Sequence, residues 1–294
     1  MQLTLIETIK QRLRYFKSVS QLHRQRQVPA AQGKLRIDKY RLAAAKRVNR
    51  DSLRHIPNWI DETSMQNSLY KYGTSEQTRE VINHEVGEGT TYSDLLATFC
   101  DLIERPNYLE IGVSVGKNFW QVINCKKIGS FWGLDIENIN AVLERKLTFV
   151  SQSKILSSFK SPRTEEGHVW RFLYEGSSVS YSAGDVYDDA VWSAFDGQKF
   201  SLIFSDASHT PEAIRSEWSQ ITSRDLLDRK GFTMVWDDLN TQAMRAAFND
   251  FVIDSGKRYG VPPNNACLTH VHGWVGTKEP YHPIGIISTH GFVT

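Results

Sequence analysis

Short apolar runs alternate with longer segments of helical pattern through the last two thirds of the chain. Five of these runs close on or beside a carboxylate, and they lie at residues 107–112, 131–136, 179–185, 200–206 and 231–238. Short strands with helical stretches between them are typical of βαβ units, which build a parallel sheet. Two further apolar segments, 266–275 and 283–288, are separated by a turn that contains Gly and Pro, and they predict an antiparallel hairpin at the sheet edge.

The first hundred residues have a helical pattern instead, with a basic amphipathic helix over residues 2–22 and a helical region at about 75–104. We therefore predict an α/β fold, a Rossmann-like, doubly wound, seven-stranded sheet with an antiparallel C-terminal hairpin, preceded by a helical N-terminal region. The predicted boundary separates the helical region at 1–104 from the α/β domain at 105–294. The connection at 137–178 is long for a crossover between strands, which favours a lid or an acceptor-binding loop.

The turn after the first predicted strand carries the most specific pattern. Glu110, Gly112, Ser114 and Gly116 follow an E-x-G-x-x-x-G spacing and are our candidate cofactor-binding residues. A dinucleotide-binding turn needs G-x-G-x-x-G, so that a pyrophosphate can approach a helix N-terminus. A carboxylate in the turn would repel a phosphate, whereas a cationic ligand with a ribose suits it, and S-adenosylmethionine is both. Taken alone, the motif is equally compatible with an ordinary strand–helix turn.

Carboxylates at the ends of the later strands extend this pattern. Asp135 ends the second strand, where a carboxylate can bind a ribose diol. Asp185 closes the third strand and could contact an adenine amino group or serve only as a turn residue. Asp206 ends the fourth strand, and Asp237 and Asp238 end the fifth. Any one of these residues could cap a helix, but their repetition at successive strand ends favours a ligand site.

Residues 107 to about 290 resemble a class I S-adenosylmethionine-dependent methyltransferase. Asp206-Ala-Ser-His209 and the Asp237-Asp238 pair are similar to motifs of the macrocin-type and cephalosporin-hydroxylase-type metal-dependent O-methyltransferases. The resemblance implies that the three acids hold a divalent ion, usually Mg²⁺, and that His209 is the general base. Such an ion lowers the pKa of a coordinated oxygen and orients it, and magnesium prefers oxygen ligands. The alternatives are that the acids cap helices and that His209 only bonds a carbonyl group.

The charge of the chain is unevenly distributed. The formal net charge is +2, yet the first fifty residues are strongly basic and contain Glu7 and Asp38 as their acids. This region could pack on the catalytic domain or on a sister subunit, which would make a homo-oligomer. It could also contact an anionic membrane surface or an acidic carrier protein that bears the substrate. Nucleic acid is the least favoured partner, because the catalytic stretch has no interleaved aromatic and basic residues.

Three scattered cysteines form neither a disulfide framework nor a C-x-x-C motif, which is typical of a reducing cytosol. The N-terminus lacks the apolar core of a signal peptide, and no stretch approaches the ~20 apolar residues of a membrane span. We therefore expect a soluble, cytoplasmic protein. His270 and His272 alternate along one predicted strand, and we expect them to be structural or to line the acceptor site.

These observations predict an S-adenosylmethionine-dependent O-methyltransferase, assisted by magnesium, that acts on a hydroxyl group of a small molecule. A secondary metabolite such as a polyketide, a peptide or an attached sugar is the expected acceptor, either free or tethered to a carrier protein. The alternatives are N- or C-methylation without a metal, and a catalytically idle methyltransferase-like protein that binds partners. A nicotinamide-dependent oxidoreductase is disfavoured, because both G-x-G-x-x-G and a Tyr-x-x-x-Lys pair are lacking.

Overall fold

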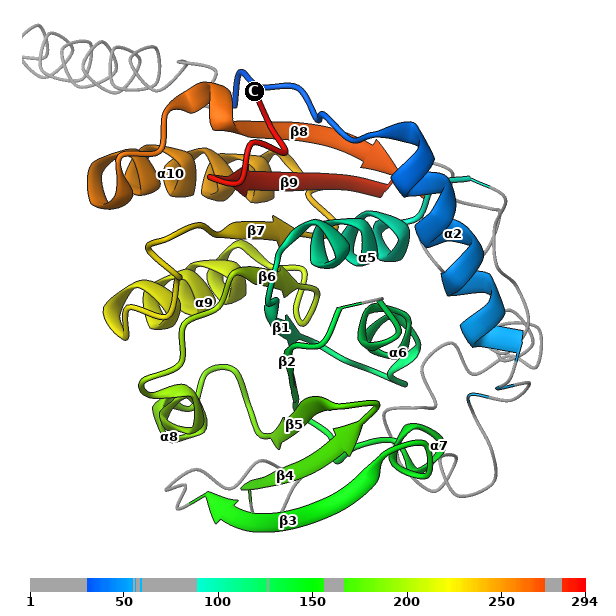
Figure 1. Ribbon diagram of the computed structural model, residues 1–294. Coiled ribbons are helices and arrows are strands. Elements are labelled where there is room, and N and C mark those ends of the chain that lie inside the picture. Colours follow the sequence, from blue (N-terminus) through cyan, green and yellow to red (C-terminus); the bar gives the residue numbers. More distant parts are fainter. Residues whose placement is uncertain are drawn as a thin grey trace, which may run out of the picture.

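The computed structural model describes residues 31–54, 56, 59, 89–125, 127–155, 167–272 and 282–294. Within these residues the chain builds a nine-stranded sheet in the order β3-β4-β5-β2-β1-β6-β7-β9-β8 (Figure 1). The parallel strands are β1 (Asn107–Ile111), β2 (Ser130–Asp135), β5 (Ser177–Ala183), β6 (Leu202–Ser205) and β7 (Thr233–Trp236). The antiparallel strands are β3 (Thr148–Ile155), β4 (Gly167–Tyr174), β8 (Ala266–Val271) and β9 (His282–Ser288).

The seven predicted strands are all present, and they form the doubly wound sheet with an antiparallel C-terminal hairpin. The predicted fold class is therefore confirmed. β1 lies between β2 and β6, so the chain reverses its direction of winding at the β1–β6 boundary. In open α/β sheets a ligand binds outside the carboxyl ends of the strands at such a switch point. The turns after β1 and β6 are thus the places where a site is expected.

The connection at 137–178 differs from the expected loop. Its described part forms a short helix, α7 (Ala141–Glu144), and the strands β3 and β4, which extend the sheet beyond β5. β4 pairs with β5 from His168 to Tyr174 and buries Val169, Trp170 and Phe172. These apolar side chains explain why the segment joins the sheet instead of forming an irregular loop. Residues 156–166 lie outside the described part.

Two layers of helices cover the sheet (Figure 1). α2 (Lys39–Arg54), α5 (Tyr92–Leu102) and α6 (Lys117–Ile123) lie on one face, and α8 (Asp189–Trp192), α9 (Pro211–Ser223) and α10 (Gln242–Tyr259) lie on the other. Short 3-10 turns occupy Ser193–Phe195 and Pro263–Asn265. Each face has its own apolar core of buried side chains. In the described part of the chain, no helix is both long and apolar enough to cross a membrane.

Local sequence explains where the helices next to the strand ends begin. α9 starts at Thr210-Pro211, because the Thr210 hydroxyl accepts from the Ala213 amide and proline suits the first helical position. α5 begins with a capping box, in which Thr91 and Asp94 exchange hydrogen bonds with each other's backbone amides. Both caps fix the loops that precede the helices.

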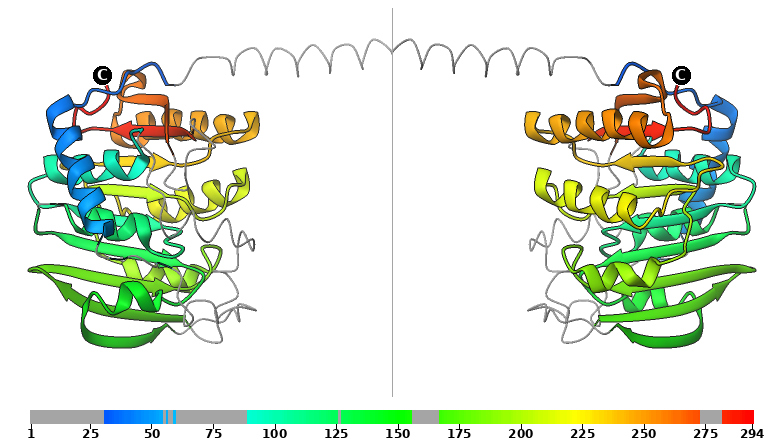
Figure 2. Two further views of the ribbon diagram at one scale, coloured as in Figure 1. Left: turned by 90° about the vertical axis from the view of Figure 1, so that its right-hand side faces the viewer. Right: turned by 90° about the vertical axis from the view of Figure 1, so that its left-hand side faces the viewer.

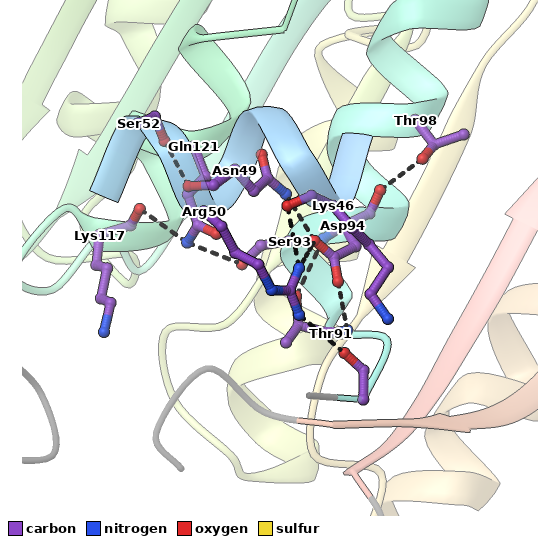
Figure 3. A network of polar contacts seen from close by, with 11 residues as sticks. Lys46, Asn49, Arg50, Ser52, Thr91, Ser93, Asp94, Thr98, Lys117 and Gln121 are labelled. Carbon is purple, nitrogen blue, oxygen red and sulfur yellow. Dashed lines mark hydrogen bonds and ion pairs between the residues drawn. The ribbon is translucent and has the colours of Figure 1, made fainter. Parts of the chain in front are cut away.

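The described part of the N-terminal region packs against the rest of the described chain. Lys34 and Thr294 exchange backbone hydrogen bonds, so the start of the described chain lies beside its C-terminal end (Figure 2). Asp94 on α5 accepts a hydrogen bond from Asn49 and pairs with Arg50, both on α2 (Figure 3). The predicted helix at 2–22 and residues 75–88 of the second predicted helical region lie outside the described residues. The domain boundary after residue 104 stays a prediction.

Candidate functional site

The turn after β1 packs closely against the loop after β6. Gly112 has a φ of +88°, and a Cβ atom there would lie 2.4 Å from the Ala207 Cα and 2.4 Å from the Asp206 carbonyl oxygen. Its amide donates to the Leu134 carbonyl group over 2.7 Å. Only glycine fits this backbone conformation and this close approach. The first glycine of the motif thus brings the β1 and β6 turns together at the switch point.

The same turn is hydrogen-bonded to the end of β2. The Ser114 amide donates to Asp135 Oδ2 over 2.7 Å, and the Glu137 amide donates to Asp135 Oδ1 over 3.0 Å. Burial raises the pKa of Asp135, and these backbone hydrogen bonds oppose the shift. Gly116, at a φ of +86°, precedes α6, and a Cβ atom there would lie 2.7 Å from Leu143 Cδ2. The predicted cofactor turn and the predicted ribose acid are therefore in direct contact.

Glu110 lies on β1, directly before this turn. The Tyr108 hydroxyl and the side-chain amide of Asn118 both donate to its Oε2, over 2.6 Å and 2.8 Å. Burial raises the pKa of Glu110 to about 8, although both hydrogen bonds favour the charged form. The Oδ1 atom of Asn118 is buried and has no hydrogen-bond partner among the described residues.

Asp185 occupies the predicted place after β5. Its Oδ1 accepts from the Tyr187 amide over 2.9 Å, which closes a local turn. This contact fits one of the two roles that the sequence allowed for Asp185, that of a turn residue. The adenine contact stays a prediction.

A cavity of about 240 Å³ opens between the β1 and β6 turns. Its lining consists of Glu110, Gly112, Val113, Ser114, Lys117, Asn118, Asp206, Ala207 and His209. Residues of the cofactor motif and residues of the strand-four motif therefore face the same space. Lys117, the first residue of α6, is almost fully buried and was not among the predicted site residues. Only its position directly after Gly116 could have indicated it.

The predicted metal acids gather beside the cavity. The His209 ring lies between two of them, with Nε2 3.7 Å from Asp206 Oδ1 and Nδ1 3.5 Å from Asp238 Oδ2. Burial, followed by the negative charges of Asp237, Glu110 and Asp238, raises the pKa of Asp206 well above its usual range. The structure thus brings together the acids and the histidine that the motifs paired.

His282, the first residue of β9, joins this group and was missed from the sequence. Its Nδ1 lies 3.3 Å from Asp237 Oδ1 and 3.0 Å from Asp238 Oδ1, and these contacts raise its pKa to about 10. The pKa of Asp238 is lowered, because the hydrogen bond from His282 and the nearby histidine charges outweigh its burial. Antiparallel pairing of Trp236 with Gly285 explains the contact, since it brings the start of β9 alongside the end of β7.

The group of described residues that could hold a metal ion includes His282 but neither His270 nor His272. The backbone of His272 bonds to Thr90 and Tyr92, and its ring packs so closely on Gly89 that a Cβ atom there would lie 2.0 Å away. His270 is exposed on β8. The contacts of His272 fit the structural role that was expected.

No protein-family model matches the chain, and no curated protein sequence matches it significantly. Solved structures do match. The O-methyltransferase TomG from Streptomyces achromogenes, involved in tomaymycin synthesis and solved with SAM, is 13% identical with a TM-score of 0.43, over 86% of this chain and 90% of that chain. Cofactor-bound Rv0187 from MTB is 16% identical with a TM-score of 0.40, over 85% and 89%. An O-methyltransferase family protein from Burkholderia thailandensis is 9% identical with a TM-score of 0.35, over 84% and 70%.

Proposed function

We propose that the protein is an S-adenosylmethionine-dependent O-methyltransferase that acts on a hydroxyl group of a small molecule. The observation that carries the proposal is the cavity at the switch point, which the glycine turn and the pair Asp206 and His209 line together. When ionised, its carboxyl groups favour a cationic ligand over a phosphate. Methyl transfer requires the sulfonium and the acceptor oxygen to meet in line, so a shared space for cofactor and acceptor suits this reaction.

The cofactor would lie across the turns after β1 and β2. Backbone amides, among them those of Ser114 and Glu137, hold the Asp135 carboxylate at the end of β2, where it would accept from a ribose hydroxyl group. Gly112 and Gly116 allow close approach of the backbone, and Ser114 and Glu110 lie beside the methionine end. Asp185 would contact the adenine amino group.

A divalent ion fits the acids at the ends of β6 and β7. Burial and then the negative charges of Asp237 and Asp238 raise the pKa of Asp206, and a bound cation would offset the repulsion among the three acids. These residues would hold a divalent ion, for which the motifs imply Mg²⁺. When bound, such an ion lowers the pKa of an acceptor oxygen and orients it.

His209 is the proposed general base. It precedes the helix cap Thr210 and is therefore outside α9, with its side chain 45% exposed at the cavity wall. The carboxylates of Asp206 and Asp238 flank its two ring nitrogens and would stabilise the imidazolium that forms when it takes the proton of the acceptor hydroxyl. Methylation of nitrogen or carbon without a metal is the second candidate, because His282 already places a positive group against Asp237 and Asp238.

Calorimetric titration with S-adenosylhomocysteine, first in EDTA and then in excess magnesium, tests the proposal. We expect a dissociation constant in the ~micromolar range, roughly −8 kcal/mol, in both buffers. Asp135→Ala should weaken this binding by about tenfold or more, because the lost ribose contact is a charged hydrogen bond. Asp196→Ala, an exposed acid on the surface, is the matched control and should bind normally. Absence of binding by the folded wild-type protein in both buffers would overturn the methyltransferase proposal.

A further inference from the structure

The acids after β7 have a nitrogen donor beside them that the sequence motifs did not include. Asp237, Asp238 and His282 each offer one ligand atom, and these three atoms lie within 4.8 Å of one another. Ligand atoms bind at roughly 2.0–2.2 Å from a transition ion, so two ligand atoms of one ion are separated by up to about twice that distance. A single ion could therefore contact all three side chains after small movements.

The backbone that carries these donors is firmly held. The Leu239 amide donates to the Pro283 carbonyl group over 2.9 Å, which ties the turn after β7 to the start of β9. The Asp237 amide donates to the Ser205 carbonyl group over 3.0 Å. Asp238 has a φ of +53° and accepts from the Asn240 side chain over 3.1 Å, so a tight turn holds it. A donor set on rigid strand ends is preorganised for an ion.

The orientation of the His282 ring is also fixed. Its side chain is 19% exposed, and its ring meets the Tyr92 ring edge-on, with the centroids 6.2 Å apart. Tyr92 is the first residue of α5 and packs on Phe204 of β6. This contact leaves Nδ1 directed at the two carboxylates.

We infer that Asp237, Asp238 and His282 form a site for a first-row transition-metal dication in preference to magnesium. Magnesium is bound almost entirely by oxygen ligands, whereas imidazole nitrogen suits zinc, iron, nickel and copper. A site of two carboxylates and one imidazole gains affinity along the series from manganese towards copper. The inference rests on the proposed function, because it names the ion that would assist the same acceptor site.

The test compares metal binding by the full chain after removal of ions with a chelator. Calorimetry with Co²⁺ and with Mg²⁺ gives the two affinities, and the visible spectrum of Co²⁺ reports nitrogen ligation. We expect Co²⁺ to bind roughly tenfold or more tightly than Mg²⁺, and His282→Ala to lower the Co²⁺ affinity by about tenfold or more. The weak Mg²⁺ affinity should not fall in this variant, because magnesium does not need the nitrogen and the change removes a positive ring from beside the two acids.

His270→Ala removes an exposed histidine from the same hairpin and is the matched control. If His282→Ala fails to fold, His282→Asn keeps a polar side chain of similar reach and replaces the nitrogen ligand with an amide oxygen. Equal affinities for Co²⁺ and Mg²⁺, or a Co²⁺ affinity unchanged in the His282 variants, would overturn the inference. It would also be overturned if neither ion binds, and His282 would then be a fixed counter-charge for the acids. Binding of S-adenosylhomocysteine in EDTA by the same preparations separates these results from a failure of the proposed function.

Discussion

Glu217 places a carboxyl group in the apolar layer between α9 and the sheet. It is fully buried, its Oε2 accepts from the Ser205 hydroxyl over 2.5 Å, and its Oε1 has no hydrogen-bond partner in the described part of the chain. Burial raises the pKa of Glu217 to about 8, so the folded protein binds this proton more tightly than the unfolded chain does. The stability that the protonated group contributes is complete below the unfolded pKa and is lost as the pH rises through about 8.

We expect Glu217→Gln to be more stable than the wild type at high pH. The amide cannot ionise, so the gain in the free energy of unfolding should be on the order of 2 kcal/mol or more at about pH 9 and close to zero at about pH 5. Urea denaturation at both pH values measures it. Glu110 titrates over the same range, so the difference between the two proteins is the relevant quantity. An equal difference at both pH values would show that Glu217 does not titrate in this window.

At the scale of elements, the contact between α2 and α5 joins the N-terminal region to the site. Arg50 Nη1 lies 3.7 Å from Asp94 Oδ1, and the Asp94 side chain is almost fully buried (Figure 3). Asp94 also caps α5, whose first residue, Tyr92, packs against His282. Part of the positive charge of α2 is thus paired with a buried acid inside the fold.

Arg50→Met should destabilise the protein, because it leaves the Asp94 carboxylate buried with fewer partners. We expect a loss of about 2–4 kcal/mol in the free energy of unfolding, measured by urea denaturation near neutral pH. Arg54 forms an exposed pair with Asp51 on the same helix, and Arg54→Met should change stability by less than about 0.5 kcal/mol. Similar losses in the two variants would mean that the Arg50–Asp94 pair stabilises the protein no more than the exposed Arg54–Asp51 pair does.

The elements that sequence reasoning found are those with a local signal. The strands were predictable from short apolar runs, and the start of α9 from Thr210-Pro211. The proximity of Asp206, Asp237 and Asp238 followed from the rule that parallel strands share one carboxyl edge. α2 lies within the predicted helical N-terminal region, but its bounds were not predicted. The β3–β4 extension was missed, because its place depends on packing between distant segments. His282 was missed for the same reason, since its role depends on the register of β9 against β7.

At the scale of the whole molecule, charge is divided between two regions. The first fifty residues carry much of the positive charge, whereas the cavity brings together Glu110, Asp206 and His209. With the pKa of Glu110 raised to about 8, the free protein holds a proton there near neutral pH. A cationic cofactor in the cavity would favour the ionised carboxylate and displace this proton.

The affinity for S-adenosylmethionine should therefore rise with pH. Each unit by which the bound sulfonium lowers the pKa of Glu110 makes the cofactor bind up to about tenfold more tightly above the free-protein pKa than below it. Calorimetry from about pH 6 to about pH 9 measures this dependence, and proton release near neutral pH can be read in buffers of different ionisation enthalpy. S-adenosylhomocysteine lacks the sulfonium charge and should show a smaller rise. Glu110→Gln keeps an acceptor for the Tyr108 hydroxyl and should remove the Glu110 contribution; a wild-type slope in this variant would place the titrating group elsewhere in the cavity.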